Sequence, residues 1–259
     1  MSKRKTSAAH EESQFISNKR NKTFYQHESK TIDFTPIRAP RTAVRPVVMV
    51  PKTLNQEKYI IALLDDSIDI VVVSGPAGVG KTYLCVLAAI KALKARQCDH
   101  IVLTRPAVGA DEENHGFLPG TLDQKMMPWL TPLFDVFAEY YSTKEIEGML
   151  ADKIIEIAPL GFMRGRTFKR SWIIGDEMQN ASKNQILMLL TRIGEGSKIV
   201  VTGDLYQRDR KFYQDNGLVD LFKRLDEANS KSIMHVELER KDVQRHRIVS
   251  EVLALYGEE

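Results

Sequence analysis

The segment Gly75-Pro76-Ala77-Gly78-Val79-Gly80-Lys81-Thr82 decides the fold of this 259-residue chain. It matches the pattern G-x-x-x-x-G-K-[ST] at every fixed position, which is the signature of a phosphate-binding P-loop. The apolar residues Asp69–Ser74 before it predict a strand, and residues 82–96 after it predict a helix. In that order, successive backbone N–H groups and the helix N-terminus surround a phosphate. A glycine-rich turn that matches the pattern by chance is the weaker interpretation.

Residues of this loop have separate predicted roles at a nucleotide. Lys81 reaches the β- and γ-phosphates as a mobile positive charge, and the Thr82 hydroxyl binds a Mg²⁺ ion that keeps several waters. The loop therefore predicts two cofactors, a nucleoside triphosphate and Mg²⁺. The predicted nucleotide-binding residues in and beside the loop are Gly75, Pro76, Ala77, Gly78, Val79, Gly80, Lys81, Thr82 and Tyr83.

An acidic pair at the end of a hydrophobic run indicates that the nucleotide is hydrolysed. Asp176 and Glu177 directly follow the apolar residues Trp172–Gly175. At the carboxyl edge of a parallel sheet, Asp176 is placed to hold Mg²⁺ and Glu177 to polarise the attacking water. Small-molecule kinases generally need no such glutamate, because their acceptor brings its own hydroxyl. The alternative is an acidic pair that ends a strand or caps the next helix.

A third strand-end cluster lies at Val200–Gln207. Polar side chains there, Asp204 and Gln207 among them, are placed to contact the γ-phosphate or a bound strand and to report hydrolysis to the domain. Asp204 could instead cap a turn, with Gly203 supplying backbone freedom. This cluster is a weak signal by itself.

Short β-branched runs alternate with helical segments along most of the chain. Near-continuous apolar runs of this kind are typical of strands in a buried parallel sheet. The fold class is therefore α/β, a P-loop NTPase with a mostly parallel sheet flanked by helices. Ser182 and Gln185 form a capping-box signature, which starts a predicted amphipathic helix that ends at Gly194. The predicted strands are residues 68–74, 100–104, 154–157, 171–175, 198–202 and 232–237.

Charge divides the chain into a basic arm and a slightly acidic body. Residues 1–45 carry ten Lys and Arg against four Asp and Glu, a net charge of +6, and the other 214 residues carry −3. We predict a disordered arm at residues 1–50 and a P-loop domain at residues 51–259, with a helical insertion at about 106–153. The arm is either an electrostatic handle for nucleic acid or a solvating tail.

Several classes of protein are excluded by composition. No stretch approaches 18 apolar residues, so we expect no transmembrane helix and no membrane partner. The polar N-terminus lacks the apolar centre of a secretory signal. Cys85 and Cys98 are too few for a disulfide framework or a zinc site. We therefore expect a cytoplasmic protein.

Seven segments taken together resemble the PhoH-like family of ATPases. The resemblance extends from about Gln56 to Tyr256, nearly all of the predicted domain. It implies a single RecA-like core related to that of superfamily 1 helicases, and an association with RNA. The segments are GPAGVGKTYL, VLTRPAVGA, GFLPG, IEIAPLGFMRGRTF, GDEMQN, LTRIGEGSKIVVTGD and DVQRH.

This resemblance implies further roles for particular residues. It favours ATP over other nucleotides and makes Gln56 an adenine-reading residue. Thr104-Arg105-Pro106 resembles a helicase motif that contacts the nucleic-acid backbone, which makes Arg105 a nucleic-acid candidate. Many members have alanine where this chain has Met178, a change at an apolar position that leaves both acids and the following glutamine in place.

The need for an arginine at the γ-phosphate leads us to predict self-association. Phosphoryl transfer usually needs an arginine, which two-lobed helicases take from their second lobe, and the ordered part of this chain is too short for two lobes. We therefore expect a homo-oligomeric ring, with a hexamer as one candidate size, in which a neighbour inserts Arg164 or Arg166. A structural salt bridge is the alternative for each of these arginines.

Our leading hypothesis is an ATPase coupled to RNA or single-stranded nucleic acid, acting as an oligomeric helicase-like motor or remodeller. The alternative is a slow nucleotide-gated switch that binds nucleic acid or protein without unwinding. A small-molecule kinase is disfavoured by Asp176 and Glu177.

Overall fold

The computed structural model describes residues 45–106, 122–205, 216–228 and 230–245, with residues 248, 249, 252 and 255; within this set the side chains of residues 122–129 are not described. The chain divides into two units, Met1–Val44 and Arg45–Glu259, and every element below belongs to the second. Most of the predicted arm, residues 1–44, lies outside the described residues. Its last residues do not: Val47 and Met49 pack against the core, and the Lys94 ammonium donates to the Arg45 carbonyl.

Six strands form one parallel sheet in the order β3-β2-β4-β5-β1-β6. This arrangement confirms the predicted α/β fold. Each predicted strand is present, with its ends within two residues of the predicted ones. The bounds are β1 (Ile70–Ser74), β2 (His100–Thr104), β3 (Ile155–Ile157), β4 (Ser171–Gly175), β5 (Lys198–Gly203) and β6 (Ile233–Glu237).

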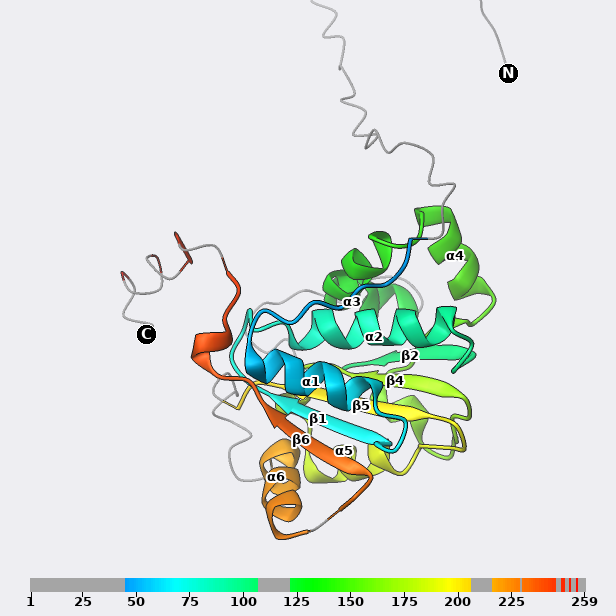
Figure 1. The fold of residues 1–259 in the computed structure, drawn as a ribbon. Helices are drawn as coiled ribbons and strands as arrows, with labels where there is room; N and C mark the ends of the chain where they lie inside the picture. The colour runs from blue at the N-terminus through cyan, green and yellow to red at the C-terminus, as the bar shows by residue number, and fades with distance from the viewer. Residues whose placement is uncertain are drawn as a thin grey trace, which may run out of the picture. The chain divides into compact units, whose positions relative to one another are not determined.

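Helices cover both faces of the sheet, giving three layers (Figure 1). Helices α1 to α4 pack on one face, and α5, α6 and two short 3₁₀ helices, η1 and η2, pack on the other. The α-helices are α1 (Leu54–Leu64), α2 (Lys81–Lys94), α3 (Leu122–Ala138), α4 (Thr143–Ala151), α5 (Lys183–Leu190) and α6 (Gly217–Glu227); the 3₁₀ helices are η1 (Leu160–Met163), η2 (Met178–Asn180) and η4 (Arg240–Asp242).

The hydrophobic core is divided by the sheet into two clusters. Along β1, Val71 and Val73 face the α2 side while Ile70 and Val72 face the α5 side, as the alternation of side chains along a strand requires. Because both faces are covered, all five residues of β1 are buried. That burial explains why the strands have near-continuous apolar sequences.

Two helices that the sequence analysis did not predict have recognisable caps. The Thr53 side chain accepts a hydrogen bond from the Gln56 N–H and starts α1. The Asn216 side chain accepts from the N–H groups of Leu218 and Val219 and starts α6. For α5, the structure confirms the predicted capping box of Ser182 and Gln185.

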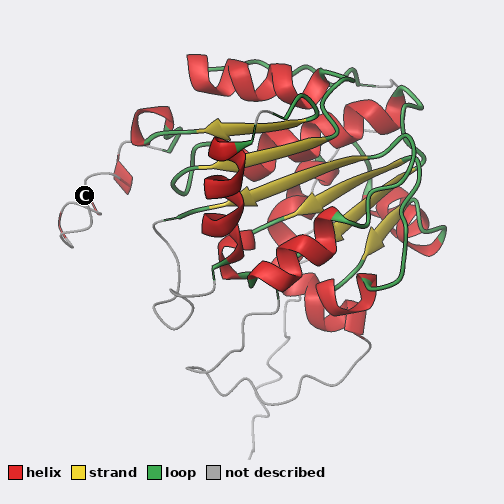
Figure 2. Cartoon of the chain, turned by 90° about the horizontal axis from the view of Figure 1, so that it is seen from below, coloured by secondary structure: helices red, strands yellow, loops and turns green. Residues whose placement is uncertain are grey.

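All six strands point their carboxyl ends toward the same edge of the sheet (Figure 2). Strands β4, β5 and β1 are neighbours, so the segments that follow them emerge side by side. The register pairs Ser74 with Gly203, which brings the start of the P-loop level with the end of β5. The sheet therefore gathers the three polar strand ends that the sequence identified.

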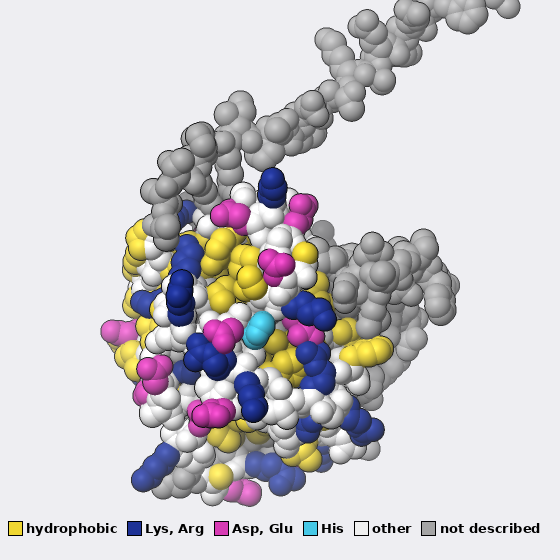
Figure 3. Space-filling model, turned by 90° about the vertical axis from the view of Figure 1, so that its right-hand side faces the viewer, with side chains coloured by type: hydrophobic (Ala, Val, Ile, Leu, Met, Phe, Trp, Pro, Cys, Tyr) yellow, Lys and Arg dark blue, Asp and Glu magenta, His cyan; other side chains and the backbone are white. Residues whose placement is uncertain are grey.

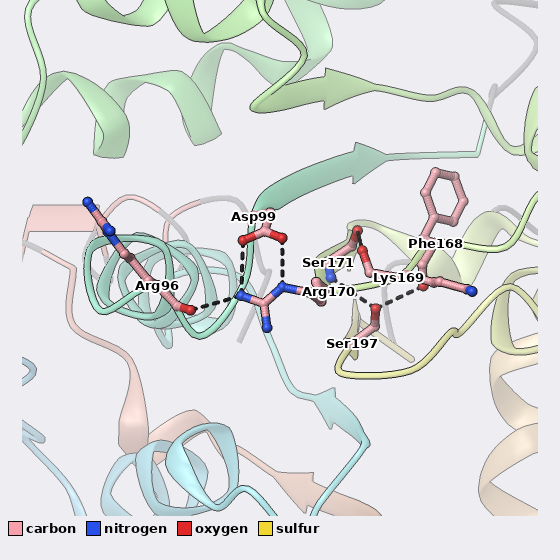
Figure 4. Close-up of polar contacts among 7 residues, drawn as sticks. All are labelled: Arg96, Asp99, Phe168, Lys169, Arg170, Ser171 and Ser197. Carbon is pink, nitrogen blue, oxygen red and sulfur yellow. Dashed lines mark hydrogen bonds and ion pairs between the residues drawn. The ribbon is translucent and has the colours of Figure 1, made fainter.

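The face at the amino ends of the strands has a different character, with basic and acidic side chains interspersed (Figure 3). There Arg170 donates two hydrogen bonds to the Asp99 carboxylate, at 2.6 and 3.0 Å, and one to the Arg96 carbonyl (Figure 4). Ser197 lies beside this group, and its hydroxyl joins the Phe168 carbonyl to the Ser171 N–H. Among the described helices, none has the length and apolar character needed to cross a bilayer.

We predict that Ser197→Ala lowers the free energy of unfolding by about 1–3 kcal/mol, because it leaves a buried N–H and a buried carbonyl without a partner. The Ser197 hydroxyl accepts from Ser171 at 2.9 Å and donates to Phe168 at 2.8 Å. Urea denaturation measures the change. Ser67→Ala is the matched control, since that hydroxyl is exposed and bonds only Asp65. Equal stability of the two variants would contradict the assignment.

Candidate nucleotide-binding site

The P-loop connects β1 to α2 and has the backbone of an anion-binding turn. Gly78 and Gly80 have φ values of 86° and 89°, in the left-handed region where a glycine costs least. Gly80 is the N-cap of α2 and provides no side chain to cap it. The first N–H groups of α2 are therefore directed at the loop, where the helix dipole favours a negative charge.

Lys81 lies within this loop, close to three carboxylates. Its ammonium donates to the carbonyls of Gly75 and Pro76, the latter at 2.8 Å. Burial lowers the pKa of Lys81, while the charges of Asp204, Glu177 and Asp176 oppose the shift and that of Arg245 adds to it. The predicted phosphate-binding lysine thus lies at the meeting point of the three strand ends.

Asp176 connects two strand ends with the start of α2. Its Oδ1 atom accepts a hydrogen bond from the Thr82 hydroxyl at 2.8 Å and another from the Thr202 hydroxyl at 2.6 Å. The carboxylate is only 4% exposed. Thr82 and Asp176 therefore present a hydroxyl and a carboxylate oxygen side by side. Hard oxygen donors of this kind suit Mg²⁺, which takes one or two protein ligands and completes its shell with water and phosphate.

Glu177 has an unusual backbone conformation that its surroundings fix. Its φ of 52° is in the left-handed region, which is uncommon for a residue with a Cβ, although Arg96, Lys153 and Arg170 share it outside the site. The Gln179 amide donates to the Glu177 carboxylate at 2.5 Å. Glu177 is half-buried, and its charge, like that of Asp176, acts on Lys81.

Gln179 is a site residue that the sequence analysis missed. Its side-chain oxygen accepts from the Asp204 N–H at 3.0 Å, and its backbone carbonyl accepts from the Asn216 amide. One buried side chain therefore joins the loop after β4 to the loop after β5. Gln179 is part of the sequence Asp-Glu-Met-Gln, but its role depends on a contact with the loop after β5, which the sequence pattern does not reveal.

At the end of β5, Asp204 is 2% exposed and near enough to act electrostatically on Lys81. Thr202, one position before Gly203, was part of the predicted strand-end cluster but was given no role of its own, and it bonds Asp176 directly. Gln207 lies outside the described residues, so its predicted catalytic role stays a prediction.

Gln56 contacts the P-loop with both ends of its amide. Its Nε2 atom donates to the Val79 carbonyl at 3.0 Å, and its Oε1 atom accepts from the Lys52 N–H at 2.8 Å. The residue is 4% exposed. In this arrangement Gln56 holds the loop in place, and adenine recognition by its amide stays a prediction. Tyr59 supports the same region by donating from its hydroxyl to the Lys81 carbonyl.

Two further predicted residues, Tyr83 and Arg105, lie in α2 and directly after β2. Tyr83 is 42% exposed, and its hydroxyl donates to the Glu139 carboxylate at 3.4 Å. Arg105 follows β2 directly and is half-buried. The preceding residue, Thr104, accepts the Asp176 N–H through its carbonyl, so Arg105 begins one residue from the acidic site.

The arginines proposed for insertion into a neighbour differ in their surroundings. Arg166 forms a bidentate ion pair with Glu156 and lies over the Phe168 ring, its Cζ atom 4.4 Å from the ring centroid. For Arg166 the alternative role, a salt bridge within the chain, is therefore the one observed, because its guanidinium donors are already bonded to Glu156. Arg192 is engaged too, donating to Met188, Arg166 and Thr191. Arg164 follows η1 and is exposed.

Comparison with known proteins gives a family match over residues 48–257, described as PhoH-like protein. A PhoH-like protein of Mycobacterium leprae is 45% identical over 211 residues, which are 80% of this chain and 58% of the relative. Protein PhoH of Escherichia coli is 35% identical over 78% of this chain and 56% of its own length. The chain thus spans a little over half the length of these curated relatives.

Among solved structures, the Pif1 helicase from Candida albicans is similar over 80% of this chain and 44% of its own. The two have a TM-score of 0.39 and 18% sequence identity. This match concerns the arrangement of the fold only.

We predict that Gln179→Leu lowers the free energy of unfolding by about 1–3 kcal/mol, because it leaves the buried Asp204 N–H without its acceptor. Urea denaturation measures the change. The matched control is Asn180→Ala, in the same loop, where no side-chain hydrogen bond is found among the described residues. If Gln179→Leu were as stable as Asn180→Ala, the proposed link between the two loops would be wrong.

Proposed function

The chain belongs to the PhoH-like protein family, and from that premise we propose that it binds ATP with Mg²⁺ and hydrolyses it. One observation carries the proposal: Lys81, Asp176 and Glu177 lie together at the carboxyl edge of the sheet, beside an anion-binding loop. A P-loop by itself serves kinases as well as hydrolases. The glutamate beside the metal-binding aspartate favours water as the phosphoryl acceptor.

Each residue has a chemical task in this reaction. The N–H groups of the loop and the Lys81 ammonium bind the β- and γ-phosphates, and Thr82 and Asp176 hold Mg²⁺. The bound ion supplies positive charge to the phosphate oxygens. Glu177 orients the water that attacks the γ-phosphorus and accepts its proton as the bond to the β-phosphate oxygen breaks. Gln179 keeps the Glu177 carboxylate in position, at 2.5 Å.

We further propose that hydrolysis is coupled to RNA or single-stranded nucleic acid. Support comes from Arg105, which directly follows the residue whose carbonyl bonds the Asp176 N–H, and from the net charge of +6 on residues 1–45. Positive charge binds the phosphate backbone and makes affinity depend on salt. The alternative is a slow switch, in which ATP changes affinity for nucleic acid or protein without unwinding.

The proposed assembly is a ring of copies in the cytoplasm, in which one copy inserts an arginine into the site of the next. Arg164 is the remaining candidate for this role, because Arg166 is held by Glu156. A head-to-tail interface closes into a ring when its rotation permits. Stimulation of ATP turnover by single-stranded RNA or DNA is the result that separates a motor from the slow switch.

We predict that Lys81→Ala weakens ATP binding at least tenfold, whereas Glu177→Gln binds ATP nearly as tightly as the wild type and hydrolyses it at least a hundredfold more slowly. One residue holds phosphate and the other acts on water. Fluorescent ATP binding and phosphate release measure the two effects. An equal loss of ATP affinity in both variants would refute this division of roles.

We also predict that ATP turnover per chain rises with protein concentration, because the inserted arginine must come from a neighbouring copy. Mixing inactive Lys81→Ala chains with Arg164→Ala chains should restore part of the activity, since each variant supplies what the other lacks. Phosphate release from the mixture is compared with release from each variant alone. Full activity of a dilute protein that sediments as a monomer would exclude the ring mechanism.

A further inference from the structure

Residues Leu238–Arg245, here called the C-terminal clamp, lie along the P-loop. The clamp follows β6 and includes η4. Its Leu238 N–H donates to the Ser74 carbonyl at 2.8 Å, and its Gln244 N–H donates to the Gly78 carbonyl at 2.9 Å. These two bonds attach the clamp to both ends of the first half of the loop. Its position relative to the loop is therefore fixed by the backbone.

A buried carboxylate anchors the clamp to α1. Asp242 has no exposed surface, and its Oδ2 atom accepts from the Glu239 N–H at 2.7 Å and from the Asn55 amide at 2.8 Å. Because Asn55 lies in the first turn of α1, next to Gln56, the clamp and α1 support the loop from adjacent positions. These hydrogen bonds fix the backbone that leads to Arg245, the last residue of the clamp.

That last residue, Arg245, lies directly against Gly78. A Cβ atom added at Gly78 would come within 2.5 Å of the Arg245 Nε atom and 2.7 Å of its Cγ atom. Any other residue at this position would displace the arginine. Gly78 is therefore needed twice, for its positive φ and for the close approach of the Arg245 side chain.

Arg245 brings a second positive charge to the loop that holds Lys81. Among the described residues, no carboxylate lies within ion-pair distance of its guanidinium, whereas Arg166, Arg170 and Arg224 each have a carboxylate partner. The Arg245 side chain lies against Gly78, while the Lys81 ammonium donates to the carbonyls of Gly75 and Pro76 in the same loop. Two cations held at one loop are stabilised together by an anion with several charges.

We propose that Arg245 is a phosphate-binding residue, which the chain supplies to its own nucleotide site through the C-terminal clamp. Its ligand class is the polyphosphate of a nucleoside triphosphate, where a planar guanidinium donates two parallel hydrogen bonds. This inference rests on the proposed function. It differs from the inserted arginine of a ring, because Arg245 belongs to the same copy as Lys81.

The test compares Arg245→Ala and Arg245→Lys with Arg240→Ala, which removes the same charge from an exposed position in the same clamp. Fluorescent analogues of ATP and ADP are titrated into each full-length variant, and thermal melting verifies folding. We expect Arg245→Ala to weaken ATP-analogue binding roughly tenfold or more and Arg245→Lys to weaken it less. Arg240→Ala should stay within about twofold of the wild type.

Mixing experiments test whether Arg245 acts within its own chain. Arg245→Ala chains mixed with Lys81→Ala chains should gain no ATP turnover, because neither copy then has both cations in one site. Restored turnover would overturn the assignment to the same copy. Arg245→Ala and Arg245→Lys chains that melt like the wild type and bind as tightly as Arg240→Ala would overturn the inference itself.

The outcomes for the wild type distinguish this inference from the proposed function. ATP binding without hydrolysis would overturn the proposed hydrolysis and leave the effect of Arg245 on binding measurable. Failure of the wild type to bind either nucleotide would overturn both. If Arg245→Ala melts at a lower temperature than the wild type, Arg245→Lys replaces it in the comparison, because it retains the charge and the alkyl chain. Its affinity for the ATP analogue, relative to that of Arg240→Ala, then decides the test.

Discussion

The arrangement of the site depends on the hydrogen bonds that the Asp176 carboxylate accepts. This carboxylate accepts hydroxyl hydrogen bonds from Thr82, at the start of α2, and from Thr202, at the end of β5. Three segments distant in sequence thereby share one buried oxygen. A buried carboxylate is costly unless its hydrogen bonds are satisfied, so the strands must keep the register that brings these hydroxyls to it. The parallel sheet supplies that register.

Support for the P-loop comes from elements outside the motif. Gln56 and Tyr59 of α1 bond the carbonyls of Val79 and Lys81, and the C-terminal clamp bonds those of Ser74 and Gly78. Lys198 holds α1 at its other end by donating to the carbonyls of its last turn. The loop is therefore braced mainly through its carbonyl groups. The Gly75 N–H donates to the Gly203 carbonyl, and the later N–H groups of the loop are the ones placed to bind an anion.

The sequence predicted what depends on local patterns. The P-loop match, the apolar strand runs and the capping box of Ser182 all specify structure over a few residues, and all were confirmed. Contacts made across the sheet had no such signal. The linking role of Gln179 depends on β4 and β5 being neighbours, and the same elements could be arranged in other strand orders. Helix α1 was missed although Thr53 and Gln56 have the spacing of a cap.

The late position of the clamp in the sequence has a consequence for folding during synthesis. Strand β1 pairs with β6, and the P-loop that follows β1 is bonded by the clamp, which is synthesised after all six strands of the sheet. Contacts between such distant segments require a large loss of chain entropy before they form. A nascent chain that has not yet reached Arg245 therefore carries the complete P-loop sequence without its full set of supporting bonds. The P-loop therefore gains its full set of supporting bonds only after β6 and the clamp have been synthesised.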